Sequence, residues 1–241
     1  MSARSSTCSR REATLGAREH PQIVAAFGGI YADARLQAYL DQTVKRLRPH
    51  SDRPDYGYRV TILNSPSINA FSLPGGYIYV TRGLLALAND SAEVAAVLAH
   101  EMAHITARHA IEREQQAQSA AIVSQVVSDV VGDAEAGAAA VAVTRGQLAQ
   151  FSRQQELQAD TIGIRTMARA GYDPDGAVTF LRALERQVNL QGKILNQTRE
   201  AGRVDIFSTH PATPQRILAA ESEARANSGS VQGERDGPGY L

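Results

Sequence analysis

Hydrophobic and polar positions change their period several times along the chain, and each change predicts an element. Between residues 21 and 47 the apolar side chains recur at three- and four-residue steps, which indicates a helix that is interrupted by the Gly-Gly pair at 28–29. Apolar and polar residues then alternate around residues 58–62, as they do in a half-buried strand. Two further strands are expected at 69–73 and 77–81, on either side of a turn at 74–76.

Helical periodicity dominates the rest of the chain. Asp90 and Glu93 form a capping-box-like start for a long helix that we expect to run beyond Ile111. Further helices are expected at 147–170, at 174–188 and at 213–227. Together these elements predict an α+β fold that is mainly α and contains one small β-sheet.

Length and composition indicate one folded unit with loose ends. The chain has 241 residues, of which 43% are hydrophobic, so it can bury one sizeable core. We expect a flexible N-terminal segment at 1–20, a single domain at 21–227, and a disordered tail at 228–241 because that stretch is polar and rich in glycine.

Charge and hydropathy narrow the class of partner. Lys and Arg number 25 and Asp and Glu number 25, so no global field attracts nucleic acid, and we expect no nucleic-acid partner. No stretch contains the run of about 18 apolar residues that a membrane-spanning helix needs, so we expect no transmembrane span. Association with a membrane surface stays open, and the sequence does not set the oligomeric state. The single cysteine, Cys8, cannot form an internal disulfide.

The strongest chemical signal is the HExxH string at 100–104, which lies inside the predicted long helix. On a helix, side chains four residues apart lie on nearly the same face, so His100 and His104 can converge on one metal ion. Glu101 then stands beside the metal as a candidate general base. Small and apolar neighbours surround this cluster, and a buried His-Glu-His group is costly unless it binds something.

A third ligand is available in the next predicted helix. Glu156 and Asp160 are four residues apart, so one face offers a metal ligand and, one turn later, a carboxylate that can accept the free ring N–H of His100. Gly163 continues this face and allows close approach to the HExxH helix. The alternative is a solvated charged face, which Arg153 and Arg165 would share.

Other histidines and carboxylates are weaker candidates. On a continuous helix His109 points about 140° away from His104, so we expect a surface or packing role for it. Glu112 and Glu135 have no second carboxylate one turn away. His20 and His50 lie in terminal or loop sequence and suggest no special role.

Four ordered motifs carry a family resemblance: the run at 69–80 (NAFSLPGGYIYV), the HEMAH string, the segment at 156–160, and Thr209-His210-Pro211 with Arg216. Together they resemble the zinc metallopeptidase family that includes HtpX, the CAAX prenyl endopeptidases and the BepA-type proteases, over about residues 21–220. The resemblance implies a zincin-like metallopeptidase domain that binds one Zn²⁺ through His100, His104 and Glu156. It implies that Glu101 is the base.

The resemblance also gives His210 a role that the residues alone do not. It places this histidine near the zinc, either to help stabilise the tetrahedral intermediate or to occupy the open coordination position in a resting state. Arg216 is expected to orient the His210 loop by pairing with a carboxylate. Relative to the family, we expect this chain to depart by lacking the membrane spans of the HtpX-like members and a helical-repeat domain of the BepA kind.

We therefore expect a zinc-dependent endopeptidase that acts on protein or peptide substrates in protein quality control, through a metal-activated water. One alternative is a latent or chaperone-like assembly module with a closed zinc site, and another is a purely structural zinc site, although such sites usually have four protein ligands. The strand at 69–73 is a candidate for binding substrate as an added strand. We expect a periplasmic or other extracytoplasmic location with the leader absent from this chain, and a cytoplasmic location is the alternative. The segment at 117–149 is expected to be mobile and to lie over or beside the active-site cleft.

Overall fold

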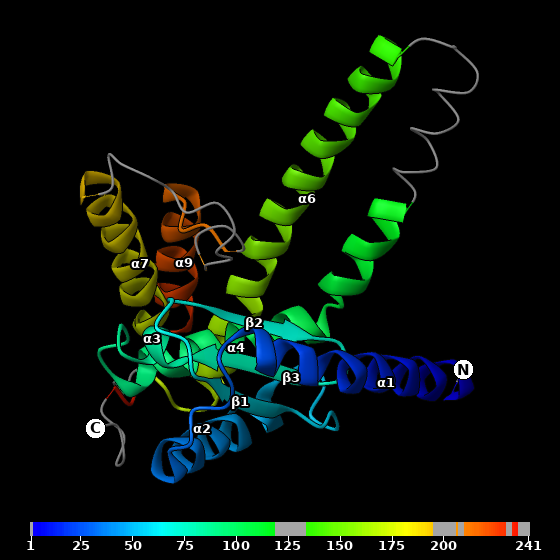
Figure 1. Ribbon diagram of the computed structural model, residues 1–241. Coiled ribbons are helices and arrows are strands. Elements are labelled where there is room, and N and C mark those ends of the chain that lie inside the picture. Colours follow the sequence, from blue (N-terminus) through cyan, green and yellow to red (C-terminus); the bar gives the residue numbers. More distant parts are fainter. Residues whose placement is uncertain (1, 119–133, 195–205, 207–209, 230–232, 236–241) are drawn as a thin grey trace.

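A computed structural model describes residues 2–118, 134–194, 206, 210–229 and 233–235 of the protein (Figure 1). The helices and strands that position the site are α1 (Ser2–Ala26), α2 (Ala34–Leu47), β1 (Arg59–Leu63), β2 (Ala70–Leu73), β3 (Tyr77–Thr81), α3 (Arg82–Leu85), α4 (Ser91–Thr106), α6 (Ala134–Arg169), α7 (Asp175–Ile194) and α9 (Pro214–Asn227). This confirms the expected mainly α fold with one small sheet.

The three predicted strands form a single sheet in the order β1-β3-β2. β1 runs parallel to β3, and β2 runs antiparallel to β3 after a tight turn. Gly75 and Gly76 in that turn have φ values of 94° and 88°, a conformation that side chains other than glycine rarely adopt. The strand order places β2 at an edge of the sheet.

The sheet is covered by helices on both faces. Side chains of β3 alternate, so that Ile78 and Val80 join the main core while Tyr77 and Tyr79 face a second cluster. Phe27, just after α1, packs on that second cluster. β3 reads as a continuous apolar run because both of its faces are buried.

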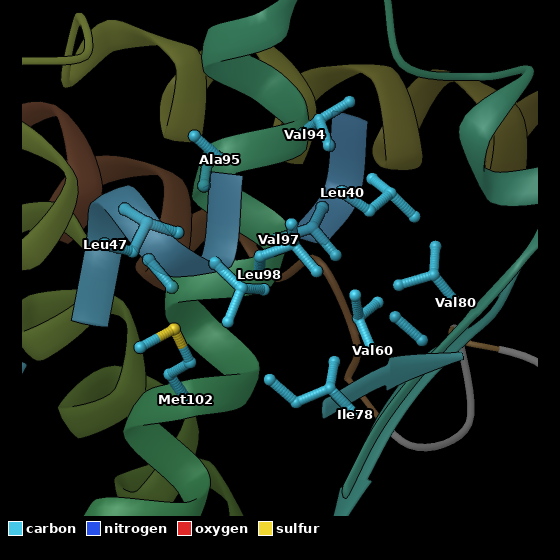
Figure 2. Close-up of a cluster of buried hydrophobic side chains, with 14 of the residues drawn as sticks. Leu40, Leu47, Val60, Ile78, Val80, Val94, Ala95, Val97, Leu98 and Met102 are labelled. Atoms are coloured by element: carbon cyan, nitrogen blue, oxygen red, sulfur yellow. The ribbon is translucent and has the colours of Figure 1, made fainter. Parts of the chain in front are cut away.

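The main core lies between the sheet, α2 and α4 (Figure 2). Leu40 and Leu47 of α2 and Leu98 of α4 are fully buried there. Burying a leucine side chain contributes about 1.5–3 kcal/mol, so these contacts fix α4 against the sheet. Almost every residue of α4 is buried, which makes it a rigid support for the HExxH motif.

The HExxH helix is shorter than its sequence predicts. We expected it to continue beyond Ile111, but α4 ends at Thr106 and a new helical stretch begins at residue 109 and runs to 118. Arg108 separates the two with a φ of 62°, the left-handed conformation that ends many helices. Glycine usually occupies that position, so the sequence carries no signal for the break.

The first helix begins earlier than its sequence predicts. A helix was expected to begin at 21, whereas α1 is helical from Ser2 to Ala26. The expected flexibility of residues 1–20 stays a prediction. Glu12 is buried in it, and its carboxylate accepts a hydrogen bond of 2.8 Å from the Tyr56 hydroxyl. The Gly28-Gly29 break is confirmed by positive φ values at both residues. The domain limits at 21 and 227 stay a prediction.

Other helix limits differ as well. α6 begins at Ala134 instead of 147, and α7 ends at Ile194 instead of 188. Within the tail at 228–241, Arg235 forms ion pairs with Asp90 and Asp173, and the expected disorder of the tail stays a prediction. The predicted mobility of 117–149 depends on residues 119–133, which lie outside the described part of the chain, and it stays a prediction.

Candidate metal centre

Helices α4 and α6 hold the centre. Asp90 caps the N-terminus of α4, and its carboxylate accepts the backbone N–H of Glu93 at 2.9 Å, as the capping pattern predicted. α6 packs on α4, and Gly163 makes the approach close: a Cβ atom at this position would lie 3.1 Å from the backbone nitrogen of His100. The expected role of Gly163 in helix contact therefore has direct geometric support.

The candidate ligand atoms converge on one point. The Nε2 atoms of His100 and His104 are 3.0 Å apart. The Glu156 carboxylate places one oxygen 3.3 Å from His100 Nε2 and the other 3.4 Å from His104 Nε2. His210 completes the cluster with Nδ1 at 3.4 Å from His100 Nε2 and 2.9 Å from both Glu156 oxygens. One ligand atom from each of these four residues lies within 4.8 Å of all the others.

These residues fit a metal ion in both spacing and chemistry. Atoms that are each about 2.0–2.1 Å from a tetrahedral metal lie roughly 3.4 Å from one another, close to the spacing seen here. The second ring nitrogens of His100 and His104 already have partners in Asp160 and His109, so both free Nε2 atoms face the same interior point. Glu156, His104 and His210 are buried, and His100 is nearly so.

Asp160 lies one turn beyond Glu156, with Oδ1 3.0 Å from His100 Nδ1, where we expected this carboxylate. The Arg216 guanidinium donates to both Asp160 oxygens at 2.7 Å and to the Pro211 carbonyl at 3.1 Å, and it lies 3.1 Å from a Glu156 oxygen. Burial alone would raise the pKa of Asp160, but the charge of Arg216 lowers it below its usual value. Arg216 thus pairs with a carboxylate, as predicted, and ties the His210 loop to α6.

The protonation behaviour of the two motif histidines differs. Burial opposes a charge on His100, but hydrogen bonds to Asp160 and Glu156 raise its pKa to about 10. Burial and the neighbouring charges of His100 and His210 hold the pKa of His104 well below its usual value. The carboxylates around His100 therefore favour a positive charge at this point, which a bound metal ion also supplies.

Glu101 faces a small cavity beside the cluster. Its Oε1 atom is 3.6 Å from His210 Nε2, and its buried Oε2 atom has no hydrogen-bond partner among the described residues. The cavity measures about 40 Å³. Its lining combines polar site residues with apolar side chains, namely Ala96, Val97, Ala177, Phe180, Leu181, Leu184 and Ile206.

His109 is the residue whose position sequence reasoning missed. It is fully buried, with Nδ1 2.9 Å from His104 Nδ1 and Nε2 3.1 Å from Gln158 Oε1. The angle of about 140° assumed a continuous helix, and the break at Arg108 removes that assumption. His109 is absent from the four-residue ligand cluster.

The remaining candidates lie elsewhere. Glu112 accepts a hydrogen bond from Gln155 at 3.2 Å and lies outside the cluster, and the Glu135 side chain is outside the described part of the structure. His20 Nδ1 is 2.9 Å from the Tyr79 hydroxyl. His50 closes a short 3₁₀ turn after α2.

Comparison with known proteins connects this geometry to relatives. The chain is 32% identical over 202 residues to the beta-barrel assembly-enhancing protease of Escherichia coli K12. This match covers 80% of this chain and 39% of that protein. It is 31% identical over 183 residues to the mitochondrial metalloendopeptidase OMA1 of Schizosaccharomyces pombe, covering 76% of this chain and 51% of the relative. The chain thus spans between about two fifths and one half of the length of these curated relatives.

None of the helices in the described part of the chain combines the length and the apolar run needed to cross a membrane.

The sequence model of peptidase family M48 matches residues 34–224, a span that contains α4, the Glu156 segment of α6 and His210. Because this match covers most of the chain and includes every residue of the metal cluster, the protein belongs to peptidase family M48.

Proposed function

We propose that this protein is a zinc-dependent endopeptidase with one zinc ion per chain, held by His100, His104 and Glu156. The observation that carries the proposal is the convergence of two imidazole Nε2 atoms and one carboxylate at separations of 3.0–3.4 Å. Two neutral imidazoles and a carboxylate form a ligand set that suits zinc and leaves a further position for substrate. When bound, the metal supplies a Lewis acid that polarises a carbonyl group and lowers the pKa of water.

Glu101 is the proposed general base. Its unpartnered Oε2 atom takes the proton of the attacking water and delivers it to the leaving amine. Because Glu101 is buried, bulk water offers this carboxylate few competing hydrogen bonds. Asp160 and Arg216 hold His100 and the His210 loop in place during the reaction.

Two features support a protein or peptide substrate. β2 is an edge strand paired only with β3 among the described strands, so an extended peptide can add to its free edge through main-chain hydrogen bonds. The cavity beside Glu101 is mostly apolar, which favours an apolar side chain next to the scissile bond. We further propose a role in protein quality control in the periplasm or another extracytoplasmic compartment, in line with the β-barrel assembly named for the bacterial relative.

The Glu101→Gln variant tests the catalytic proposal. This change removes the base and leaves all four cluster residues, so we expect unchanged zinc content and a loss of cleavage of about 10²-fold or more. Metal content is measured on the purified protein, and casein cleavage is followed with the cut sites mapped by mass spectrometry. A chelator should abolish wild-type cleavage, and added Zn²⁺ should restore it.

Other outcomes would point to the alternatives. Zinc-loaded wild-type protein that never cleaves would favour a structural zinc site or a chaperone-like module. Loss of zinc from Glu101→Gln would show that Glu101 is a ligand and not the base. Cut sites without any preference for apolar residues would show that the cavity does not set the cleavage specificity.

A second candidate, a latent enzyme with a closed site, is favoured by the position of His210. Its Nδ1 atom lies within 2.9 Å of Glu156, so this histidine is close enough to act as a fourth ligand. His210→Ala distinguishes the two roles: basal cleavage rises if His210 closes the site at rest. If His210 instead stabilises the oxyanion, turnover falls by about 10²-fold or more with zinc retained. Unaltered kinetics would assign neither role to it.

A further inference from the structure

We propose that His109 is a positioning residue for the metal site: with Gln158 it forms a hydrogen-bonded relay that fixes the ring orientation and tautomer of His104. This inference rests on the proposed metal-binding function. Metal-ligating histidines usually give their second ring nitrogen to a carboxylate, a carbonyl or water. His100 follows that rule through Asp160, whereas His104 faces a second imidazole.

The backbone is shaped to bring His109 to this position. A continuous helix would carry His109 well away from the face of His104. Arg108 is instead the one non-glycine residue with a positive φ in the described part of the chain, and the helix restarts immediately after it. A non-glycine residue in this conformation costs free energy, and such residues often occur at functional sites. Here the turn places the two Nδ1 atoms 2.9 Å apart.

The donors and acceptors along the relay then determine the tautomers. The Nε2 atom of His104 presents its lone pair to the metal cluster, so in a neutral ring the proton lies on Nδ1. That proton must be donated, and the nearest acceptor is the Nδ1 atom of His109. His109 can accept only if its own proton lies on Nε2, and this atom faces the carbonyl oxygen of Gln158 at 3.1 Å. Both Nδ1 atoms and the Nε2 atom of His109 thereby have a partner of the correct kind.

A hydrogen bond to its backbone carbonyl also fixes the position of His109. The buried Gln155 side chain donates to the His109 carbonyl at 3.3 Å and to Glu112 at 3.2 Å. Two positions of α6 thus hold a residue that comes after the end of α4, while Glu156 of the same helix faces the metal cluster. The relay therefore couples the His104 ring to the helix that supplies the third ligand.

A matched pair of variants tests the relay. His109→Leu removes the acceptor, so zinc affinity should fall by about 10- to 100-fold in a chelator competition assay. His109→Asn keeps an acceptor oxygen at the place of Nδ1, and it should recover most of that affinity. His50→Leu, the same change far from the site, should bind zinc as the wild type does. Unchanged affinity in a folded His109→Leu protein would overturn the proposal.

Two further measurements keep the test valid if His109→Leu does not fold. ¹⁵N-edited NMR of the zinc-loaded wild-type protein should show the His109 proton on Nε2 and the His104 proton on Nδ1, and a His109 proton on Nδ1 would contradict the relay. Gln158→Leu alters an exposed residue of α6 and should weaken zinc binding, whereas Gln158→Glu keeps the acceptor. A wild-type protein that binds no zinc would refute the proposed function itself, which separates the two failures.

Discussion

Asp160 shows how one carboxylate serves both the metal site and the fold. It faces His100 Nδ1 on one side and receives two hydrogen bonds from Arg216 on the other. Arg216 is buried and also contacts Glu156, so one guanidinium offsets part of the negative charge of the ligand and of its supporting carboxylate. A bidentate pair of this kind sets the orientation of Asp160 as well as its charge.

Asp160→Ala should therefore weaken zinc binding by about 10- to 100-fold, because His100 loses the acceptor that orients its ring. The fold should survive, since Arg216 keeps Glu156 and the Pro211 carbonyl as partners. Zinc affinity measured by chelator competition, with circular dichroism as the check on folding, reports both effects. Asp55→Ala, at an exposed position, serves as the control. Wild-type affinity in Asp160→Ala would leave Asp160 with a purely structural role.

At the residue scale, sequence spacing predicted the pairs of site residues that share one helix face. It did not predict the position of a residue that follows a break in the helix. Residues four apart on one helix must share a face, so His100 with His104 and Glu156 with Asp160 could be paired from the sequence. His109 could not be placed, because its position depends on the left-handed conformation of Arg108. No glycine or asparagine marks that residue.

The contact between α4 and α6 depends on a position without a side chain. Gly163 lies against the backbone of His100, so the distance between the two ligand-bearing helices is set at this point. Ala99 contributes to the same contact from α4. Small residues let two helices approach closely, and here that approach brings Glu156 within reach of both histidines.

Gly163→Val should separate the helices at the metal site. Its side chain would press on backbone atoms of α4 that cannot rotate away, which costs about 1–3 kcal/mol of stability. Zinc affinity should fall as well, because His100 moves relative to Glu156. Gly57→Val makes the same change where a Cβ atom would meet nothing within 4 Å, so it should leave both quantities nearly unchanged. Thermal unfolding and chelator competition measure the two effects, and a folded Gly163→Val protein with wild-type zinc affinity would contradict this account.

At the element scale, local patterns located the three strands and most of the helices, but they did not give the pairing of the sheet. Alternation identifies a strand and its buried face, whereas the parallel pairing of β1 with β3 depends on the helices that cover both faces. The limits of α6 and α7 were also misplaced. Propensity alone sets helix ends poorly.

At the scale of the whole molecule, the C-terminal residues connect parts of the chain that the sequence keeps far apart. The Arg235 guanidinium bonds to Asp90, the N-cap of α4, and to Asp173 just before α7. Glu234 pairs with Arg46 of α2. Disorder was predicted because this tail is polar and rich in glycine, but composition does not report charge partners that are more than 60 residues away in sequence.

Arg235→Ala should lower the thermal stability of the whole domain without changing the chemistry of the site. The ion pairs of Arg235 are partly shielded from solvent, so their loss should cost about 1–2 kcal/mol, more than a fully exposed pair. For a chain of this size, each kcal/mol shifts Tm by about 2–4 °C. Arg225→Ala removes an exposed arginine whose ion pair spans 3.9 Å, and it should leave Tm nearly unchanged. Differential scanning calorimetry compares the two variants at low and high salt. An equal Tm for both would show that residues 233–235 do not stabilise the fold. A loss of zinc from Arg235→Ala would instead show that α4 needs this contact at its N-terminus to hold His100 and His104 in place.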